Sequence, residues 1–137
     1  MSEFEWSEQL SIGITPMDQD HQKIIALMNE LDQAHERKAT VGEIDRAFKR
    51  LADFTRQHFR EEEAYMEEIG FTGIGSHKMI HKKLLTNMDQ HYQTFKSTSA
   101  LNDEVFIFLR FWLKSHICGI DRKYADVALA DSHARTG

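Results

Sequence analysis

The sequence has few of the residues that stiffen, cross-link or break a chain. It contains a single cysteine, Cys118, so an internal disulfide is impossible and a reducing compartment suits the protein best. Its 137 residues include only one proline and seven glycines. Because these two residues are the main interrupters of helices, their scarcity favours a mostly helical protein.

Segments for membrane insertion, secretion or nucleic-acid binding are also missing. The longest apolar stretch, residues 105–113, contains Arg110 and is too short to cross a bilayer. Residues 1–6 are acidic and lack the basic and apolar regions of a signal peptide. The net charge of −5 argues against a nucleic-acid partner. We therefore expect a cytoplasmic protein without a membrane span.

What the chain does contain is an ordinary globular composition, with 41% hydrophobic and 28% charged residues. Apolar residues recur at steps of three and four in four stretches, each typical of an amphipathic helix. The length fits one domain, residues 1–137, with an N-terminal arm (1–14), a bundle (about 15–118) and a C-terminal segment (119–137). The arm is expected to pack against the bundle through Trp6, Leu10, Ile12 and Ile14.

Start and stop residues divide the four stretches. Gly70 is expected to end the second helix, a polar loop at 96–100 to end the third, and Gly119 to break the fourth. Residues 120–130 are expected to form only a short turn before a frayed tail. The expected N-terminal caps are Thr15 with Pro16 behind it, Thr40 in a capping box with Glu43, Ser76 and Asn102.

Four helices with short connections predict an all-α, up-down-up-down antiparallel bundle. In this topology the starts of the first and third helices share an end with the finishes of the second and fourth. Seven side chains that can bind metal fall at this shared end. They are His21, His58, Glu62, His77, His81, His116 and Asp121.

Glu62 is the most informative of the seven. It falls on the apolar stripe of its helix, whereas its acidic neighbours Glu61 and Glu63 fall off the stripe. A carboxylate that faces a core is unfavourable unless it is paired or binds a metal. Glu62 is therefore predicted to take part in a buried site.

The remaining three histidines are predicted to lie outside the site. His35 is 14 residues from His21, which is about 21 Å along a helix. His91 is similarly displaced from His81, and His133 lies in the expected tail. We assign His35 and His91 to packing at the opposite end of the bundle.

The donor set favours two metal ions over one. Five imidazoles and two carboxylates are too many for a tetrahedral zinc site, and a structural zinc bundle would leave ligands unused. They suit two octahedral ions that share the carboxylates. No His-Glu-x-x-His run of a zinc protease is present, and Cys118 is expected to be a small buried residue instead of a ligand.

Asp121 can join this set only if the fourth helix is irregular. Five residues separate it from His116, which corresponds to about 140° of rotation on a regular helix. We therefore predict that the helix is distorted or ends near Cys118 and Gly119. Such a distortion would turn the carboxylate inward.

These spacings resemble the hemerythrin family, in particular the single-domain bacterial hemerythrins. The matching motifs are the lone His21 after Asp18-Gln19-Asp20, His-x-x-x-Glu at 58–62, His-x-x-x-His at 77–81 and His-x-x-x-x-Asp at 116–121. The resemblance implies two iron ions. His77, His81 and His116 would bind one and His21 and His58 the other, with Glu62, Asp121 and an oxide or hydroxide as bridges.

The resemblance also implies a function. The iron with two histidines would keep an open position for dioxygen beside an apolar wall formed by Ile24, Phe59, Trp112 and Ile117. A non-enzymatic protein that binds dioxygen reversibly, for carriage, storage or delivery, is the leading hypothesis. The alternatives are an oxygen or redox sensor that acts through a separate protein, and a di-iron enzyme acting on iron, peroxide or nitric oxide. No acid in the apolar wall could serve as the proton donor that an enzyme needs.

Overall fold

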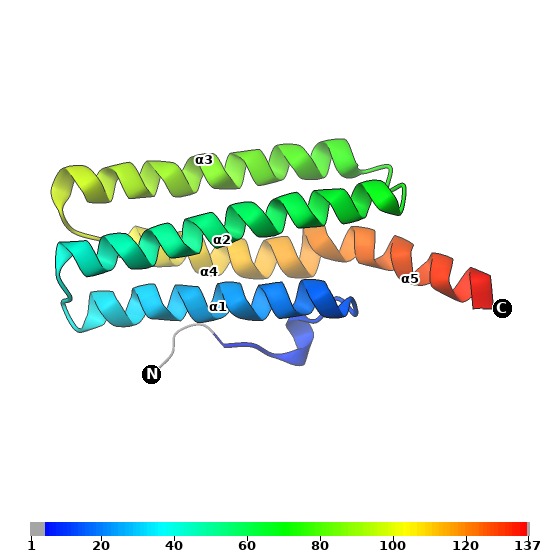
Figure 1. Cartoon of the computed structure of the whole chain (residues 1–137), viewed down its shortest axis with the longest axis horizontal. Coiled ribbons are helices and arrows are strands. Elements are labelled where there is room, and N and C mark those ends of the chain that lie inside the picture. Colours follow the sequence, from blue (N-terminus) through cyan, green and yellow to red (C-terminus); the bar gives the residue numbers. More distant parts are fainter. Residues whose placement is uncertain (1–4, 137) are drawn as a thin grey trace.

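The computed structural model describes residues 5–136, with side chains through residue 130. Four helices lie side by side and alternate in direction (Figure 1). They are α1 (Thr15–Glu36), α2 (Val41–Glu68), α3 (Ile74–Thr98) and α4 (Asp103–Ser115). Residues 5–136 contain no strand, so the predicted all-α, up-down-up-down bundle is confirmed.

The predicted apolar stripes form the core between the helices. On α2, for example, Ile44, Phe48 and Leu51 are buried, and the stripe continues through Thr55 to the site residues. The buried Thr55 hydroxyl donates to the carbonyl of Leu51, 2.7 Å away, so this polar group is satisfied within its own helix. The stripe therefore changes from apolar to polar along α2 without leaving the core.

Two of the predicted helix boundaries are confirmed at α2. The Thr40 side chain accepts the backbone N–H of Glu43 at 3.2 Å, as the capping box requires. Gly70 follows the helix with φ of 68°, the left-handed conformation that glycine adopts readily. The start and the stop of α2 are thus both fixed by local side-chain and backbone chemistry.

Other boundaries differ from the predictions. Thr15 is the first residue of α1 and not its cap, and the first turn is instead held by Asp18, which accepts the Ile12 N–H at 2.9 Å. Ser76 lies inside α3, because the turn after Phe71 winds directly into the helix at Ile74. Asn102 precedes α4 but makes no capping hydrogen bond through its side chain.

The predicted polar loop at 96–100 is also wrong for most of its length. Helix α3 continues to Thr98, and Ser99 ends it in a left-handed conformation with φ of 58°. The hydroxyl of Thr98 donates to the carbonyl of Thr94 at 2.9 Å, so this polar side chain is accommodated on the helix. Polar composition alone did not mark the helix end.

The C-terminal segment is more ordered than predicted. After α4 the chain makes a π-helical turn, His116–Asp121, and continues as α5 (Arg122–Thr136), which extends beyond the bundle (Figure 1). The predicted distortion near Cys118 and Gly119 is therefore confirmed, but the prediction of only a short turn at 120–130 is wrong, because a helix begins at Arg122 and continues through these residues. Tyr124 and Ala125 are fully buried and anchor the first turn of α5 in the core.

The N-terminal arm packs as predicted and lies over the π-helical turn. Leu10, at the end of a short 3-10 helix (Glu8–Leu10), and Ile12 are buried. The guanidinium of Arg122 donates to the carbonyls of Gln9 and Ser11 at 3.2 and 2.9 Å. None of the helices described in residues 5–136 contains an apolar stretch that could span a bilayer.

Candidate metal centre

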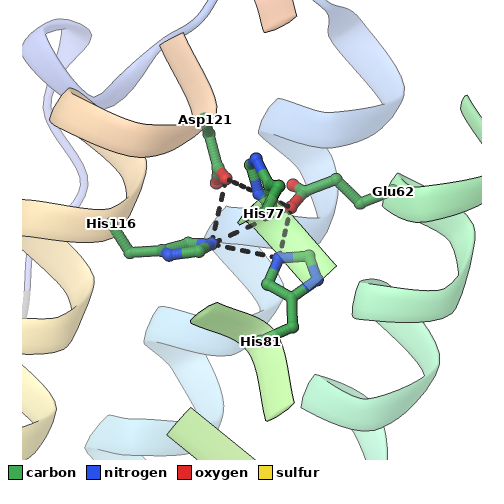
Figure 2. A group of neighbouring side chains, drawn as sticks. All are labelled: Glu62, His77, His81, His116 and Asp121. Atoms are coloured by element: carbon green, nitrogen blue, oxygen red, sulfur yellow. Dashed lines mark hydrogen bonds and ion pairs between the residues drawn. The ribbon is translucent and has the colours of Figure 1, made fainter. Parts of the chain in front are cut away.

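All seven side chains predicted as ligands meet at one end of the bundle. Helix α1 contributes one, α2 two, α3 two, and the π-helical turn the last two. Each is at most 3% exposed. Figure 2 shows five of them directed toward a common centre. The residues brought together are His21, His58, Glu62, His77, His81, His116 and Asp121. Their role as metal ligands remains a prediction.

The carboxylate of Glu62 lies between two sets of imidazoles. Its Oε1 is 2.9 Å from Nε2 of His81 and 3.2 Å from Nε2 of His77. Its Oε2 is 3.1 Å from Nε2 of His58. The two oxygens of one carboxylate therefore face different helices, which is the arrangement of a bridging ligand.

Asp121 is placed in the same way by the π-helical turn. Its Oδ1 is 3.0 Å from Nε2 of both His77 and His116. Its Oδ2 is 3.2 Å from Nε2 of His21. A π-helical turn includes an extra residue, which lets His116 and Asp121 point to the same side although a regular helix would separate them.

The seven side chains thus form two groups that share both carboxylates. In each group one ligand atom per residue lies within 4.8 Å of all the others, and every member is buried. The first group contains three histidines and the second contains two. The groups are Glu62, His77, His81, His116 and Asp121, and His21, His58, Glu62 and Asp121.

Two pairs of imidazole nitrogens approach each other within these groups. Nε2 of His21 is 3.1 Å from Nε2 of His58, and Nε2 of His81 is 3.2 Å from Nε2 of His116. Neighbouring ligands of an octahedral ion with bonds of about 2.1 Å are roughly 3 Å apart. The observed spacings therefore fit ligand atoms arranged around metal ions.

Acidic residues behind two of the histidines orient the rings. Nδ1 of His58 lies 2.9 Å from a carboxylate oxygen of Asp20, and Nδ1 of His81 lies 2.8 Å from a carboxylate oxygen of Glu63. A proton on Nδ1 in each contact leaves the lone pair of Nε2 directed into the centre. In this tautomer the Nε2 lone pairs of His58 and His81 can bind a metal ion.

The pKa shifts of the buried acids and histidines also indicate that the site favours bound positive charge. Burial raises the pKa of Glu62, but hydrogen bonds with surrounding histidines outweigh it and hold the pKa well below the ordinary value. Burial lowers the pKa of His58, but its contacts with Asp20 and Glu62 raise it to about 10. The same balance, with Asp121 as the main partner, raises the pKa of His116 to about 9. Protons would thus occupy the site when no metal is bound, and metal binding would release them.

A third supporting residue comes from α5. The Tyr124 hydroxyl donates to Oε2 of Glu62 at 2.9 Å and is fully buried. Burial, followed by the charge of Glu62, raises the pKa of this phenol, so it stays protonated and acts as a donor. The hydrogen bond fixes the orientation of the carboxylate that both groups share.

Sequence reasoning did not identify Asp20, Glu63 or Tyr124 as supporting residues. Asp20 and Glu63 are each adjacent in sequence to a predicted ligand, so proximity was an available signal. Tyr124 lies three residues after Asp121, on the same helical face, but residues 120–130 are predicted to form only a short turn. A search for acids and phenols beside the ligand positions would have found all three.

The predicted apolar wall is buried and contacts the site histidines. The ring of Phe59 stacks on that of His81, with centroids 3.8 Å apart and planes 3° apart. The ring of Trp112 is nearly parallel to that of His116 at 6.0 Å. Ile24 and Ile117 are at most 1% exposed. Phe59 and Trp112 thus lie against imidazoles of the site, and the role of all four side chains as a pocket wall remains a prediction.

Two of the three histidines predicted to lie outside the site, His35 and His91, are in neither group. His35 contacts the ring of Phe106 at 5.2 Å, and His91 contacts Phe108 at 5.0 Å. The side chain of His133 lies outside the described residues. Cys118 belongs to neither group, as expected, but it is only partly buried and not fully buried as predicted. Its thiol lies at the surface beside the N-terminal arm and donates to the carbonyl of Gln9 at 3.6 Å.

Comparison with known protein families agrees with a cation-binding site at this end of the bundle. Residues 12–128 match the family model of the hemerythrin HHE cation-binding domain. The chain belongs to the hemerythrin family. This agrees with the resemblance that the ligand spacings carry.

Individual members of the hemerythrin family are similar over most of their length. A bacteriohemerythrin of Stenotrophomonas maltophilia is 35% identical over 123 residues, which cover 88% of this chain and 78% of the relative. A hemerythrin-like protein of Naegleria gruberi is 32% identical, with 92% of this chain and 94% of the relative covered. The crystal structure of a wild-type hemerythrin superimposes with a TM-score of 0.81 at 27% identity, covering 91% and 97% of the two chains.

Proposed function

We propose that this protein binds dioxygen reversibly at a pair of iron ions, for carriage, storage or local delivery. One observation carries the proposal: two groups of ligands share Glu62 and Asp121 but contain three and two histidines. The group with His21 and His58 therefore has a coordination position to spare. The single cysteine, which cannot form an internal disulfide, supports a reducing, cytoplasmic location for this function.

Iron is supported by the donor set and by family membership. Imidazoles combined with carboxylates suit divalent iron, and the shared carboxylates suit a pair of ions. His77, His81 and His116 would hold one ion, and His21 and His58 the other, with a bridging oxide or hydroxide between them. Two ferrous ions held there would supply the two electrons for reversible binding of one dioxygen molecule.

The surrounding side chains prepare the site for binding without turnover. Phe59 and Trp112 cover imidazoles on the inner side and exclude water, which would otherwise bring protons to the site. Among the four wall residues, the only polar atom is the indole Nε1 of Trp112, whose proton is not acidic at neutral pH. The wall therefore offers no proton that would drive the reduction of dioxygen to completion.

The proposal is tested by oxygenation of the reduced, iron-loaded protein. We expect a visible absorption band to form when air is admitted and to disappear under vacuum over repeated cycles. The His91→Ala variant should behave identically, because this residue lies outside both ligand groups. Irreversible oxidation in the first cycle, with continuous consumption of added reductant, would instead identify an enzyme.

A further inference from the structure

A groove between α3 and α4 has no role in the proposed dioxygen site. Its volume is 320 Å³, at the small end of the range for ligand pockets. Its inner wall includes Trp112 and His116, so it lies directly outside the metal centre. The lining residues are Ile80, Lys83, Leu84, Asn87, Phe108, Phe111, Trp112, Ser115, His116 and Ile120.

Apolar side chains dominate this α3–α4 groove and remain open to water. Phe111 is 72% exposed, and Ile80, Leu84 and Phe108 are half-buried around it. A single exposed apolar residue is normal on a protein surface. Several that line one concave surface indicate a site for a hydrocarbon or aromatic group.

The charge at the groove has the opposite sign to that of the protein as a whole. None of the lining residues is acidic, and Lys83 places an exposed ammonium at the rim, with Asn87 and Ser115 as further polar groups. Residues 74–123 contain eight Lys or Arg and four Asp or Glu, a balance of +4, whereas the rest of the chain carries −9. Lys83 is the one lysine or arginine that lines the groove, and its ammonium favours an anionic ligand there although the protein as a whole is acidic.

We propose that the α3–α4 groove binds a small amphiphilic anion, a ligand with an apolar body and one carboxylate or sulfonate. The apolar body would lie against Leu84, Phe108 and Phe111, and the anionic group would contact the ammonium of Lys83. The groove is closed on its inner side by the buried Trp112, which limits the ligand to a single hydrocarbon chain or a fused ring pair. Its small, concave volume favours such a ligand over the broad surface of a protein partner.

The test uses the fluorescence of anilinonaphthalene sulfonate, an apolar anion, with the full-length, iron-loaded protein. We expect saturable binding of one probe per chain and displacement by decanoate below its micellar concentration. Decanol, which has the same hydrocarbon chain and no charge, should displace the probe less effectively. Lys83→Met keeps the apolar stem and should weaken decanoate binding about 1.5- to 5-fold, the effect of losing one exposed charge contact.

Two matched variants keep the result interpretable. Lys82→Met changes the neighbouring exposed lysine, which does not line the groove, and should bind decanoate as the unmodified protein does. Ser115→Phe fills the groove from its exposed rim and should abolish probe binding while the thermal unfolding midpoint shows that the chain is folded.

Three outcomes would overturn the proposal. The first is equal decanoate affinity of Lys83→Met and Lys82→Met, and the second is equal displacement by decanol and decanoate. The third is a loss of probe binding as the chain self-associates in sedimentation experiments, which would identify the groove as a contact between two copies.

Discussion

The two ends of the bundle use the same helical stripes for different purposes. At the site end, His21 on α1 and His81 on α3 face other histidines and the shared carboxylates. At the far end, His35 and His91 on the same two helices lie against phenylalanine rings. A histidine on a buried stripe is thus a ligand candidate at one end and a packing residue at the other.

The difference lies in what the opposing helices present, not in concavity or burial alone. A hollow of 780 Å³ at the far end, lined in part by His35 and Phe106, is larger than the α3–α4 groove. Among the described residues, however, clusters of possible metal ligands occur only at the site end. The two ends therefore differ because ligand atoms from α1, α2, α3 and the π-helical turn converge at one of them. The volume of the hollow does not distinguish them.

The largest expected effect comes from removing the shared carboxylate. Glu62→Ala should lower iron affinity by more than about 100-fold, since losing a residue that merely supports a ligand already costs 10- to 100-fold. His91→Ala should leave the iron content near that of the unmodified protein, because its ring contacts Phe108 and no ligand group. Elemental analysis after chelator challenge measures both. Equal iron loss in the two variants would show that the two ends do not differ as proposed.

A second prediction concerns the pH dependence of the metal-free protein. Its folded-state pKa values, about 10 for His58 and about 9 for His116, lie above the ordinary value of about 6.5. The stabilisation from these protonated rings is complete below pH 6.5 and is lost as the pH rises toward 10. The free energy of unfolding of the metal-free protein should therefore fall as the pH rises from 6 to 10.

Urea unfolding at a series of pH values measures this slope. His58→Ala should flatten it, whereas His91→Ala at the far end should leave it unchanged. The iron-loaded protein should depend less on pH in this range, because metal ions replace the protons. A stability of the metal-free protein that stays level or increases with pH would contradict the proposed electrostatics.

A third, smaller effect is expected from the acids that orient the site histidines. Glu63→Gln removes the charge beside Nδ1 of His81 and should weaken iron binding about 10- to 100-fold. Glu67→Gln changes an exposed acid on the same helix and serves as the matched control. Competition with a chelator of known affinity measures both. Identical iron affinities of the two variants would show that Glu63 does not contribute to iron binding through His81.

The smallest effect is expected away from the site. The Tyr92 hydroxyl donates to the carboxylate of Asp45. This hydrogen bond joins α3 to α2 and lowers the pKa of Asp45. Tyr92→Phe should reduce the free energy of unfolding by about 1 kcal/mol, the net value of one hydrogen bond. Chemical denaturation measures the loss, and iron content should not change. A change in iron content would show that the two regions are coupled.

The stripes and the bundle topology could be predicted because apolar period and chain direction are properties of the sequence itself. Glu62 was recognisable as a polar residue on an apolar stripe, and the five-residue step to Asp121 required an irregular helix. Both features are local, and both are present in the structure.

The supporting residues could not be predicted in the same way. Glu63 is off its own stripe, and it reaches Nδ1 of His81 only because α3 lies beside that edge of α2. Tyr124 faces the site only because the chain stays helical after the π-helical turn. Such contacts depend on the rotation and separation of neighbouring helices, which periodicity does not determine.

The extra residue in the turn His116–Asp121 also sets the rotation of α5 about its own axis. Deleting Gly119 would restore the usual pitch and rotate α5 by about 100° about its axis. The second shared carboxylate, the phenol of Tyr124 and the guanidinium clasp of Arg122 on the N-terminal arm would all leave their partners together. One extra residue in the backbone therefore sets the geometry of three otherwise separate contacts. A shift of one residue at this turn would change the orientation of every side chain on α5.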